Sequence, residues 1–145
     1  MAKFLAVDWG KARLGLAVSD DLGITAQGLS SLPRVSESAD IDAIGTYVHD
    51  LGIEGVVVGL PKNMDGTLGP SADAAQSFAE ALRVRLHIPV HLWDERLTSL
   101  AAERTLVGAG IRRRARRDVQ DKVAAIMILQ GFLDRRHVTV EQGDL

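Results

Sequence analysis

The run Gly55-Val56-Val57-Val58-Gly59-Leu60 carries no polar side chain, so a strand built from it is apolar on both faces. A strand of this kind is typical of the centre of a parallel sheet, where helices cover both faces. Apolar residues at helical spacing follow over residues 71–86, and a second short apolar run follows over residues 89–93. Together these segments predict a strand, helix, strand unit with a right-handed crossover.

Two further apolar runs precede this unit. Residues 3–7 and 14–18 are separated by a short glycine-containing stretch, which predicts an antiparallel hairpin. The predicted fold class is therefore α/β: a mixed central sheet in which an antiparallel hairpin is followed by parallel strands, with helices on both faces. The remaining expected elements are a strand near residues 25–32, a helix over 40–51 that Gly52 ends, and helices over 100–107 and 119–133.

The length of 145 residues predicts one domain, residues 1–145. The chain has no cysteine, which excludes disulfides and thiolate metal sites and favours a reducing compartment. Any metal must therefore be held by Asp, Glu, Asn or His. Neither a secretion signal nor an apolar run of membrane length is visible, so we expect a soluble cytoplasmic protein without a membrane partner.

Three carboxylates stand where an ion is costly to desolvate. Asp8 and Glu95 each follow an apolar strand-like run, and Asp121 lies in the last predicted helix. Each has an ordinary explanation: Asp8 as a turn former, Glu95 as the partner of Arg96, and Asp121 as a helix-start acid. One shared cation explains all three together. Mg²⁺ or Mn²⁺ is the natural candidate, because hard cations prefer oxygen ligands.

The chemistry of such a site is phosphodiester cleavage. Two divalent ions about 3.5–4 Å apart, bridged by carboxylates, activate a water and stabilise the leaving oxygen. Several carboxylates are needed because the two ions bring a large positive charge. Asp118 lies close to one turn before Asp121 on the predicted helix, so its side chain points in a similar direction.

A block of basic residues lies between the predicted helices over residues 100–107 and 119–133. The formal net charge of the chain is −2, yet five arginines are concentrated in this one stretch. A local basic stripe is what a phosphate backbone requires, although the charge run taken alone favours a solvated loop or helix face. The block consists of Arg112, Arg113, Arg114, Arg116 and Arg117.

Four motifs, spread over nearly the whole chain, resemble the YqgF/RuvX proteins. These proteins are described as Holliday junction resolvases and as nucleases that mature the precursor of small-subunit ribosomal RNA. The order and combination of the motifs are far more specific than any one of them. They are Asp8-Trp9-Gly10 with Arg13, Gly15 and Ala17 to Ser19-Asp20; Val58-Gly59-Leu60-Pro61 with Met64-Asp65-Gly66; Asp94-Glu95-Arg96-Leu97-Thr98; and Asp121-Lys122 with Ala124-Ala125 and Ile128-Leu129.

The resemblance implies a ribonuclease-H-like fold, a nucleic-acid substrate, and Asp8, Glu95 and Asp121 as the metal-binding catalytic acids. The wider resolvase superfamily often has paired acids three residues apart on this helix. YqgF/RuvX proteins, however, are not expected to have an acid at the position of Asp118. This residue therefore ranks below the three catalytic acids, as an auxiliary metal ligand.

Two basic residues outside the block are candidate phosphate contacts. Arg13 follows the turn beside Asp8 and either contacts the scissile phosphate or forms a salt bridge within the hairpin. Lys62 lies on a glycine-flanked loop after the central strand, where it either clamps substrate or belongs to an ordinary strand-to-helix connection.

Two other function classes remain as alternatives. The opening hairpin also resembles the phosphate-binding start of sugar kinases and actin-like ATPases, but those enzymes clamp nucleotide between two such domains. A non-catalytic module that docks on structured RNA or ribosomal precursors would bind nucleic acid without cutting it. The sequence also leaves the substrate open between a four-way DNA junction and a precursor rRNA. A resolvase would favour a twofold homodimer, whereas RNA trimming needs one copy.

Overall fold

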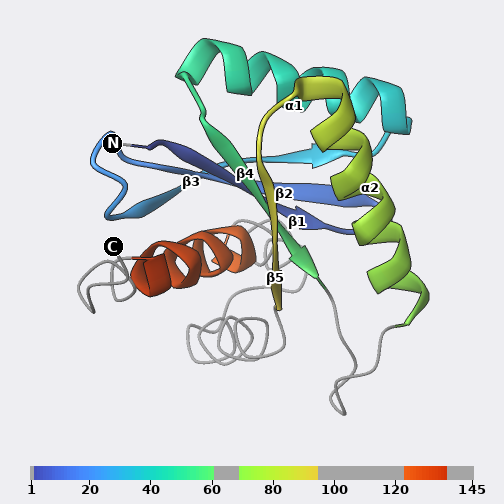
Figure 1. The fold of residues 1–145 in the computed structure, drawn as a ribbon. Helices are drawn as coiled ribbons and strands as arrows, with labels where there is room; N and C mark the ends of the chain where they lie inside the picture. The colour runs from blue at the N-terminus through green and yellow to red at the C-terminus, as the bar shows by residue number, and fades with distance from the viewer. Residues whose placement is uncertain (1, 61–68, 95–122, 137–145) are drawn as a thin grey trace.

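The computed structural model describes residues 2–60, 69–94 and 123–136. Within these residues, five strands form one sheet in the order β3-β2-β1-β4-β5, in which β1 is antiparallel to β2 and parallel to β4 (Figure 1). The elements are β1 (Phe4–Trp9), β2 (Arg13–Ser19), β3 (Ala26–Pro33), α1 (Glu37–Leu51), β4 (Gly55–Leu60), α2 (Pro70–Leu86), β5 (Val90–Asp94) and a last helix over residues 123–136.

The expected α/β class and mixed sheet are confirmed. β4, the strand without a polar side chain, pairs in parallel with β1 on one side and β5 on the other, and all six of its residues are buried. Helices on both faces of the sheet shield β4 from water. The predicted helix over residues 100–107 lies outside the described residues.

The first hairpin differs from its sequence expectation. Asp8 and Trp9 are inside β1 rather than in the connection, and Arg13 is the first residue of β2. The reason is that the backbone of β1 is hydrogen-bonded on both sides, so the strand continues past the last apolar residue. The interpretation of Asp8 as a turn former is therefore wrong.

Helix ends follow the local chemistry. The side chain of Ser36 accepts a hydrogen bond from the backbone N–H of Ala39, so α1 begins earlier than the apolar spacing alone indicated. Gly52 ends the helix in the left-handed conformation, with φ of 66°. The role predicted for Gly52 is confirmed.

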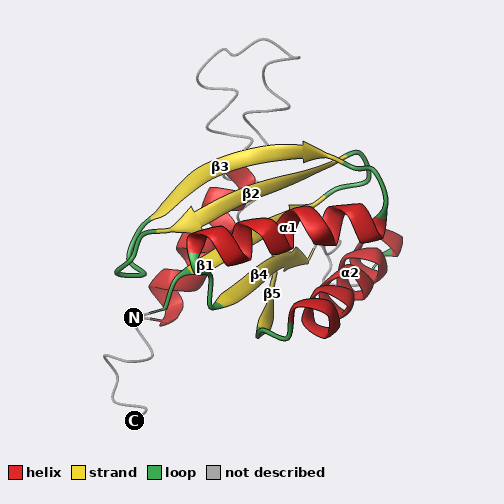
Figure 2. Ribbon diagram, turned by 90° about the horizontal axis from the view of Figure 1, so that it is seen from above, coloured by secondary structure: helices red, strands yellow, loops and turns green. Residues whose placement is uncertain are grey.

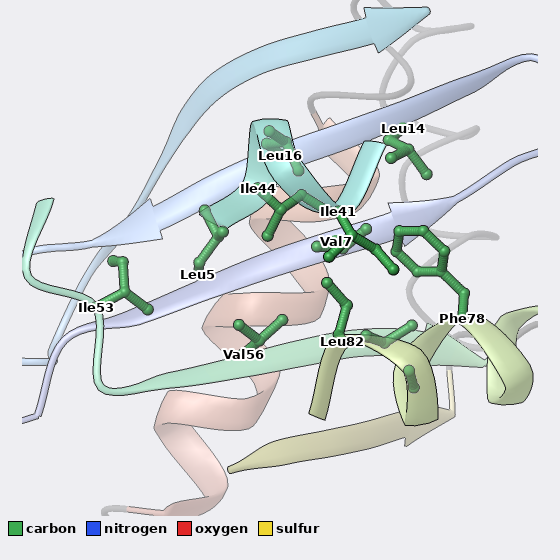
Figure 3. Packing of buried hydrophobic residues seen from close by; sticks show 12 residues of the cluster. Leu5, Val7, Leu14, Leu16, Ile41, Ile44, Ile53, Val56, Phe78 and Leu82 are labelled. Carbon is green, nitrogen blue, oxygen red and sulfur yellow. The ribbon is translucent and has the colours of Figure 1, made fainter. Parts of the chain in front are cut away.

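Helices cover both faces of the sheet. Figure 2 shows α1 and α2 over one face, with the helix of residues 123–136 behind the strands. In Figure 3 the side chains on the α1/α2 face converge between strands and helices. This cluster comprises Leu5, Val7, Leu14, Leu16, Ile41, Ile44, Ile53, Val56, Val58, Phe78, Ala79 and Leu82. In the described part of the chain, no helix has the length and apolar character needed to cross a membrane.

Candidate active site

Asp8 lies on the sheet face that helix 123–136 covers. Phe4 and Ala6 belong to the apolar cluster that contains Ala125, Ile128, Leu129 and Leu133 of this helix. Because successive side chains of a strand alternate between faces, Asp8 shares the face of Phe4 and Ala6. Its neighbours in sequence, Val7 and Trp9, pack on the opposite face under α1 and α2. Asp8 itself is half-buried.

Glycines flank Asp8 on both sides. Gly15 of β2 and Gly59 of β4 are the residues directly opposite Asp8 in the two neighbouring strands. Among the described glycines only Gly23 and Gly52 have a positive φ, so the backbone at Gly15 and Gly59 does not require glycine. What these two glycines supply is the absence of a side chain beside the Asp8 carboxylate.

Arg13 shares this face with Asp8. It lies two residues from Gly15 along β2, a diagonal neighbour of Asp8 at a distance that long side chains bridge. Its guanidinium Nε donates to the hydroxyl of Ser31 at 2.8 Å, and Nη2 donates to the Ser31 carbonyl at 3.3 Å. The arginine is therefore held against β3, with its charge at the same end of the sheet as Asp8.

The end of β5 lies beside this region. Trp93 pairs with Gly59, and a Cβ on Gly131 of the last helix would lie 2.8 Å from the Trp93 ring, so Trp93 faces that helix. Asp94 follows as the last residue of β5 and pairs with Leu60 at the end of β4. The carboxyl ends of β1, β4 and β5 therefore meet at one edge of the sheet.

The last helix runs antiparallel to β1 (Figure 1). Near its C-terminal end, the Phe132 ring lies 5.1 Å from the Phe4 ring and the Arg136 guanidinium lies 4.8 Å from the same ring. Phe4 is the first residue of β1, so the helix begins toward the opposite end of the strand, where Asp8 lies.

Most predicted site residues are outside the described part of the chain. Asp8 and Arg13 are placed on one face by the structure. Among the described residues no three metal-ligating side chains come together. The predicted residues outside are Glu95, Asp118, Asp121, Lys62, Arg112, Arg113, Arg114, Arg116 and Arg117.

Two groups near the end of the sheet opposite Asp8 have shifted pKa values. Hydrogen bonds from backbone N–H groups, that of Ile24 first, lower the pKa of Asp20 in the turn after β2. Partial burial, followed by the nearby charge of Arg136, lowers the pKa of His91. His91 packs against Phe132 with ring centroids 5.0 Å apart, which supports a structural role for this histidine.

An ion pair that no sequence motif marks supports the turn after Asp8. Arg34 Nε donates to the carboxylate of Asp40 at 2.6 Å, and Arg34 Nη1 donates to the carbonyl of Gly10 at 3.0 Å. Arg34 follows β3 directly and Asp40 lies in α1, six residues later, whereas Gly10 lies in the β1–β2 turn and is brought to Arg34 only by the fold.

Comparison with known proteins adds sequence relatives. A family profile described as "RuvX: Holliday junction resolvase" matches residues 2–135. A Moorella thermoacetica protein named "Putative pre-16S rRNA nuclease" is 49% identical over 133 residues, covering 92% of this chain and 95% of that protein. A Geobacillus kaustophilus protein of the same name is 48% identical over 134 residues, covering 91% and 97%.

Two solved structures share the fold. RuvC of T. thermophilus, in complex with a Holliday junction substrate, aligns with a TM-score of 0.61 at 16% identity, covering 96% of this chain and 98% of that one. A fowlpox virus resolvase bound to Holliday junction DNA aligns with a TM-score of 0.56 at 7% identity, covering 92% and 98%. These likenesses confirm the expected ribonuclease-H-like fold.

Proposed function

This chain belongs to the RuvX family, described as Holliday junction resolvases, and from this premise we propose that it is a metal-dependent endonuclease that hydrolyses phosphodiester bonds of structured nucleic acid. The family assignment made from the four motifs is confirmed by the profile match and by the relatives at nearly half identity. The enzyme class is hydrolase. We further propose that residues 1–145 form one nuclease domain in the cytoplasm, in keeping with the absence of cysteine.

The observation that carries the proposal is Asp8 between two glycines. A half-buried carboxylate at the end of a central strand, with no side chain at the paired position of either neighbouring strand, supplies the oxygen ligands that a hard cation prefers. The donor set fits Mg²⁺ or Mn²⁺, since it consists of carboxylate oxygens and contains no thiol.

Glu95 and Asp121 are the proposed partners of Asp8. Glu95 directly follows Asp94, and one more residue of strand alternation would place it on the face of Trp93, which is also the face of Asp8. Asp121 precedes the buried Ala125 by four residues, the spacing that keeps two side chains on one face of a helix. Asp118 remains the auxiliary ligand.

We assign the remaining roles by charge. The carboxylates would hold two divalent ions, whose chemistry when bound is activation of a water and stabilisation of the leaving oxygen. Arg13, already oriented by Ser31, would contact a phosphate beside the cleaved bond. Lys62 and the basic block (Arg112, Arg113, Arg114, Arg116 and Arg117) would hold the polyanion further along its backbone.

Two substrates fit this chemistry. The name shared by the relatives favours a precursor of 16S rRNA, whereas the family description and the RuvC complex favour a four-way DNA junction. A non-catalytic docking module is the competing function, and it would bind the same nucleic acids without cutting them. A twofold homodimer in solution would favour the junction, because its two scissile strands are related by symmetry.

The test compares the parent protein with Asp8→Asn and Asp121→Asn on both substrates, with Mg²⁺, with Mn²⁺ and with a chelator. Asp50→Asn is the matched control, because it removes the same charge from an α1 side chain that is 64% exposed. We expect cleavage only with metal. Cleavage should fall by at least about 100-fold in the two site variants, because groups that merely support metal ligands already cost 10–100-fold.

Binding measured in chelator separates the alternatives. Site variants that bind like the parent but do not cut support the nuclease. Metal-independent binding without cleavage by the parent protein would favour the docking module. Full activity of Asp8→Asn would exclude Asp8 as a metal ligand.

A further inference from the structure

Arg34 connects three separate parts of the fold. Beside its bonds to Asp40 and Gly10, its backbone N–H donates to the carbonyl of Ala12 at 2.9 Å. Its guanidinium carbon lies 5.1 Å from the Trp9 ring centre and 5.5 Å from that of Phe78 in α2. Both ends of the β1–β2 turn are therefore attached to one residue.

The charge of Arg34 is held in place by a buried partner. Asp40 is 4% exposed and Arg34 is 20% exposed. The second carboxylate oxygen of Asp40 accepts from the backbone N–H of Val35 at 3.1 Å, so both of its oxygens are engaged. A buried ion pair stabilises little relative to apolar residues of similar size. Here the bonds to Asp40 and Gly10 hold the Arg34 guanidinium in one position.

The fixed geometry concerns the residues next to the candidate site. Trp9 faces Arg34, and Asp8, one residue earlier, faces the opposite side of the sheet. Gly10 packs so tightly in the turn that a Cβ would lie 2.8 Å from the carbonyl oxygen of Arg13. The backbone of Gly10 therefore lies close to that of Arg13, and Trp9 pairs with Leu14, the residue after Arg13, so the turn is joined to the strand ends that carry Asp8 and Arg13.

We propose that Arg34 is a positioning residue of the nuclease: by holding the Gly10 carbonyl and the Trp9 ring, it sets the directions of Asp8 and Arg13 on the far face of the sheet. The proposal rests on the proposed function. Arg34 itself contacts no substrate, because it lies on the α1/α2 side and is largely buried.

Replacing Arg34 by lysine tests whether Arg34 positions the site residues or only stabilises the fold. Arg34→Lys keeps a positive charge for Asp40, so the buried carboxylate keeps a counter-ion. The lysine ammonium is a single point charge without the planar fork that bonds Asp40 and Gly10 together and lies over Trp9. Arg34→Met removes both the charge and the fork. Arg85→Met is the matched control, because Arg85 forms an exposed ion pair with Asp42 between α2 and α1.

The experiment measures kcat and KM of these variants on whichever substrate the parent cuts, at a temperature at which circular dichroism shows all of them folded. Hydrogen exchange of residues 9–13 is followed in parallel. We expect kcat to fall between about 10- and 100-fold in Arg34→Lys and Arg34→Met, the scale of a small misplacement of reacting groups. KM should change less than kcat, because Lys62 and the basic block, which hold the rest of the polyanion in the proposed function, are left in place. Exchange in the turn should rise, and the control should match the parent.

Parent-like kcat in both Arg34 variants would overturn the proposal, and so would a loss of thermal stability with kcat per folded molecule unchanged. These results differ from a failure of the proposed function. If Asp8→Asn cuts like the parent, the nuclease site itself is misassigned, and the positioning role falls with it. If Asp8→Asn is inactive while the Arg34 variants are fully active, only the positioning role is wrong.

Discussion

The two faces of the central sheet are built from different residues. On the α1/α2 face, β1 and β2 present Leu5, Val7, Leu14 and Leu16 to two helices, and all four are fully buried. On the face of helix 123–136, the same strands present Phe4, Ala6, Ala17, Gly15 and Asp8. The first face is closed by large side chains, whereas the second becomes small and then polar toward the end of β1, where Asp8 lies opposite Gly59 of β4.

This difference separates stability from chemistry. Burying a large aliphatic side chain stabilises a fold by roughly 1.5–3 kcal/mol, so the α1/α2 face supplies much of the stability. A glycine beside a carboxylate contributes no such burial and leaves space for a ligand. One strand can serve both purposes because its side chains alternate between faces.

The largest expected effect is on the closed face. Leu82→Ala, in a fully buried position of α2, should lower the free energy of unfolding by about 2–5 kcal/mol because it leaves a cavity. Urea denaturation measures this change. Cleavage per folded molecule should be unaffected. Val84→Ala in the same helix, where the side chain is 54% exposed, is the control, and a comparable loss there would contradict the packing argument.

On the face of helix 123–136, we expect a substitution to affect cleavage more than stability. Gly15→Val places a side chain beside Asp8 and should reduce kcat/KM between about 10- and 100-fold by displacing the reacting groups. The free energy of unfolding should fall less than in Leu82→Ala, by about 1–3 kcal/mol, because Gly15 is buried and the added side chain must be accommodated. Gly28→Val in β3, another strand glycine without a positive φ, is the control. Parent-like cleavage by Gly15→Val would show that the glycine-lined space is not used.

A smaller effect concerns the attachment of the last helix. The side chain of Gln130 accepts from the N–H of Ala26 at 3.0 Å and donates to the carbonyl of Ile24 at 2.8 Å. Gln130→Ala should lower the free energy of unfolding by about 1 kcal/mol, since water replaces part of these bonds. The midpoint of urea denaturation checks this value. An unchanged midpoint would mean that apolar contacts alone hold the helix to the sheet.

The smallest effect is the pH response of His91. Its pKa is lowered from the ordinary value of 6.5 by burial and then by Arg136. As the pH falls below 6.5, the unfolded chain binds a proton that the folded chain resists, so stability declines toward acid and is unaffected above that value. His91→Gln should remove this part of the decline, measured as thermal midpoints between pH 8 and pH 5. Identical pH profiles of the parent and His91→Gln would refute the burial explanation.

Much of the fold could be predicted because it follows from local patterns. The apolar run at residues 55–60 indicated β4, the helical spacing at residues 71–86 indicated α2, and Gly52 indicated the end of α1. The strand boundaries around Asp8 were missed, because the backbone pairing of β1 with two neighbours extends the strand beyond its apolar residues. Asp8 was predicted as a site residue because desolvating a carboxylate beside an apolar run is costly, and its place on the sheet supports that role.

Local periodicity thus determined, from the sequence by itself, the class of the sheet and helices, and the four motifs indicated the family. The tertiary structure decided which residues became neighbours: Gly15 and Gly59 beside Asp8, and Arg34 between Asp40 and Gly10. The physical reason is the distance along the chain over which each kind of interaction acts. An apolar repeat acts within one element, whereas strand register and the hydrogen bond from Arg34 to Gly10 join residues from different elements, and these contacts exist only once the elements have packed.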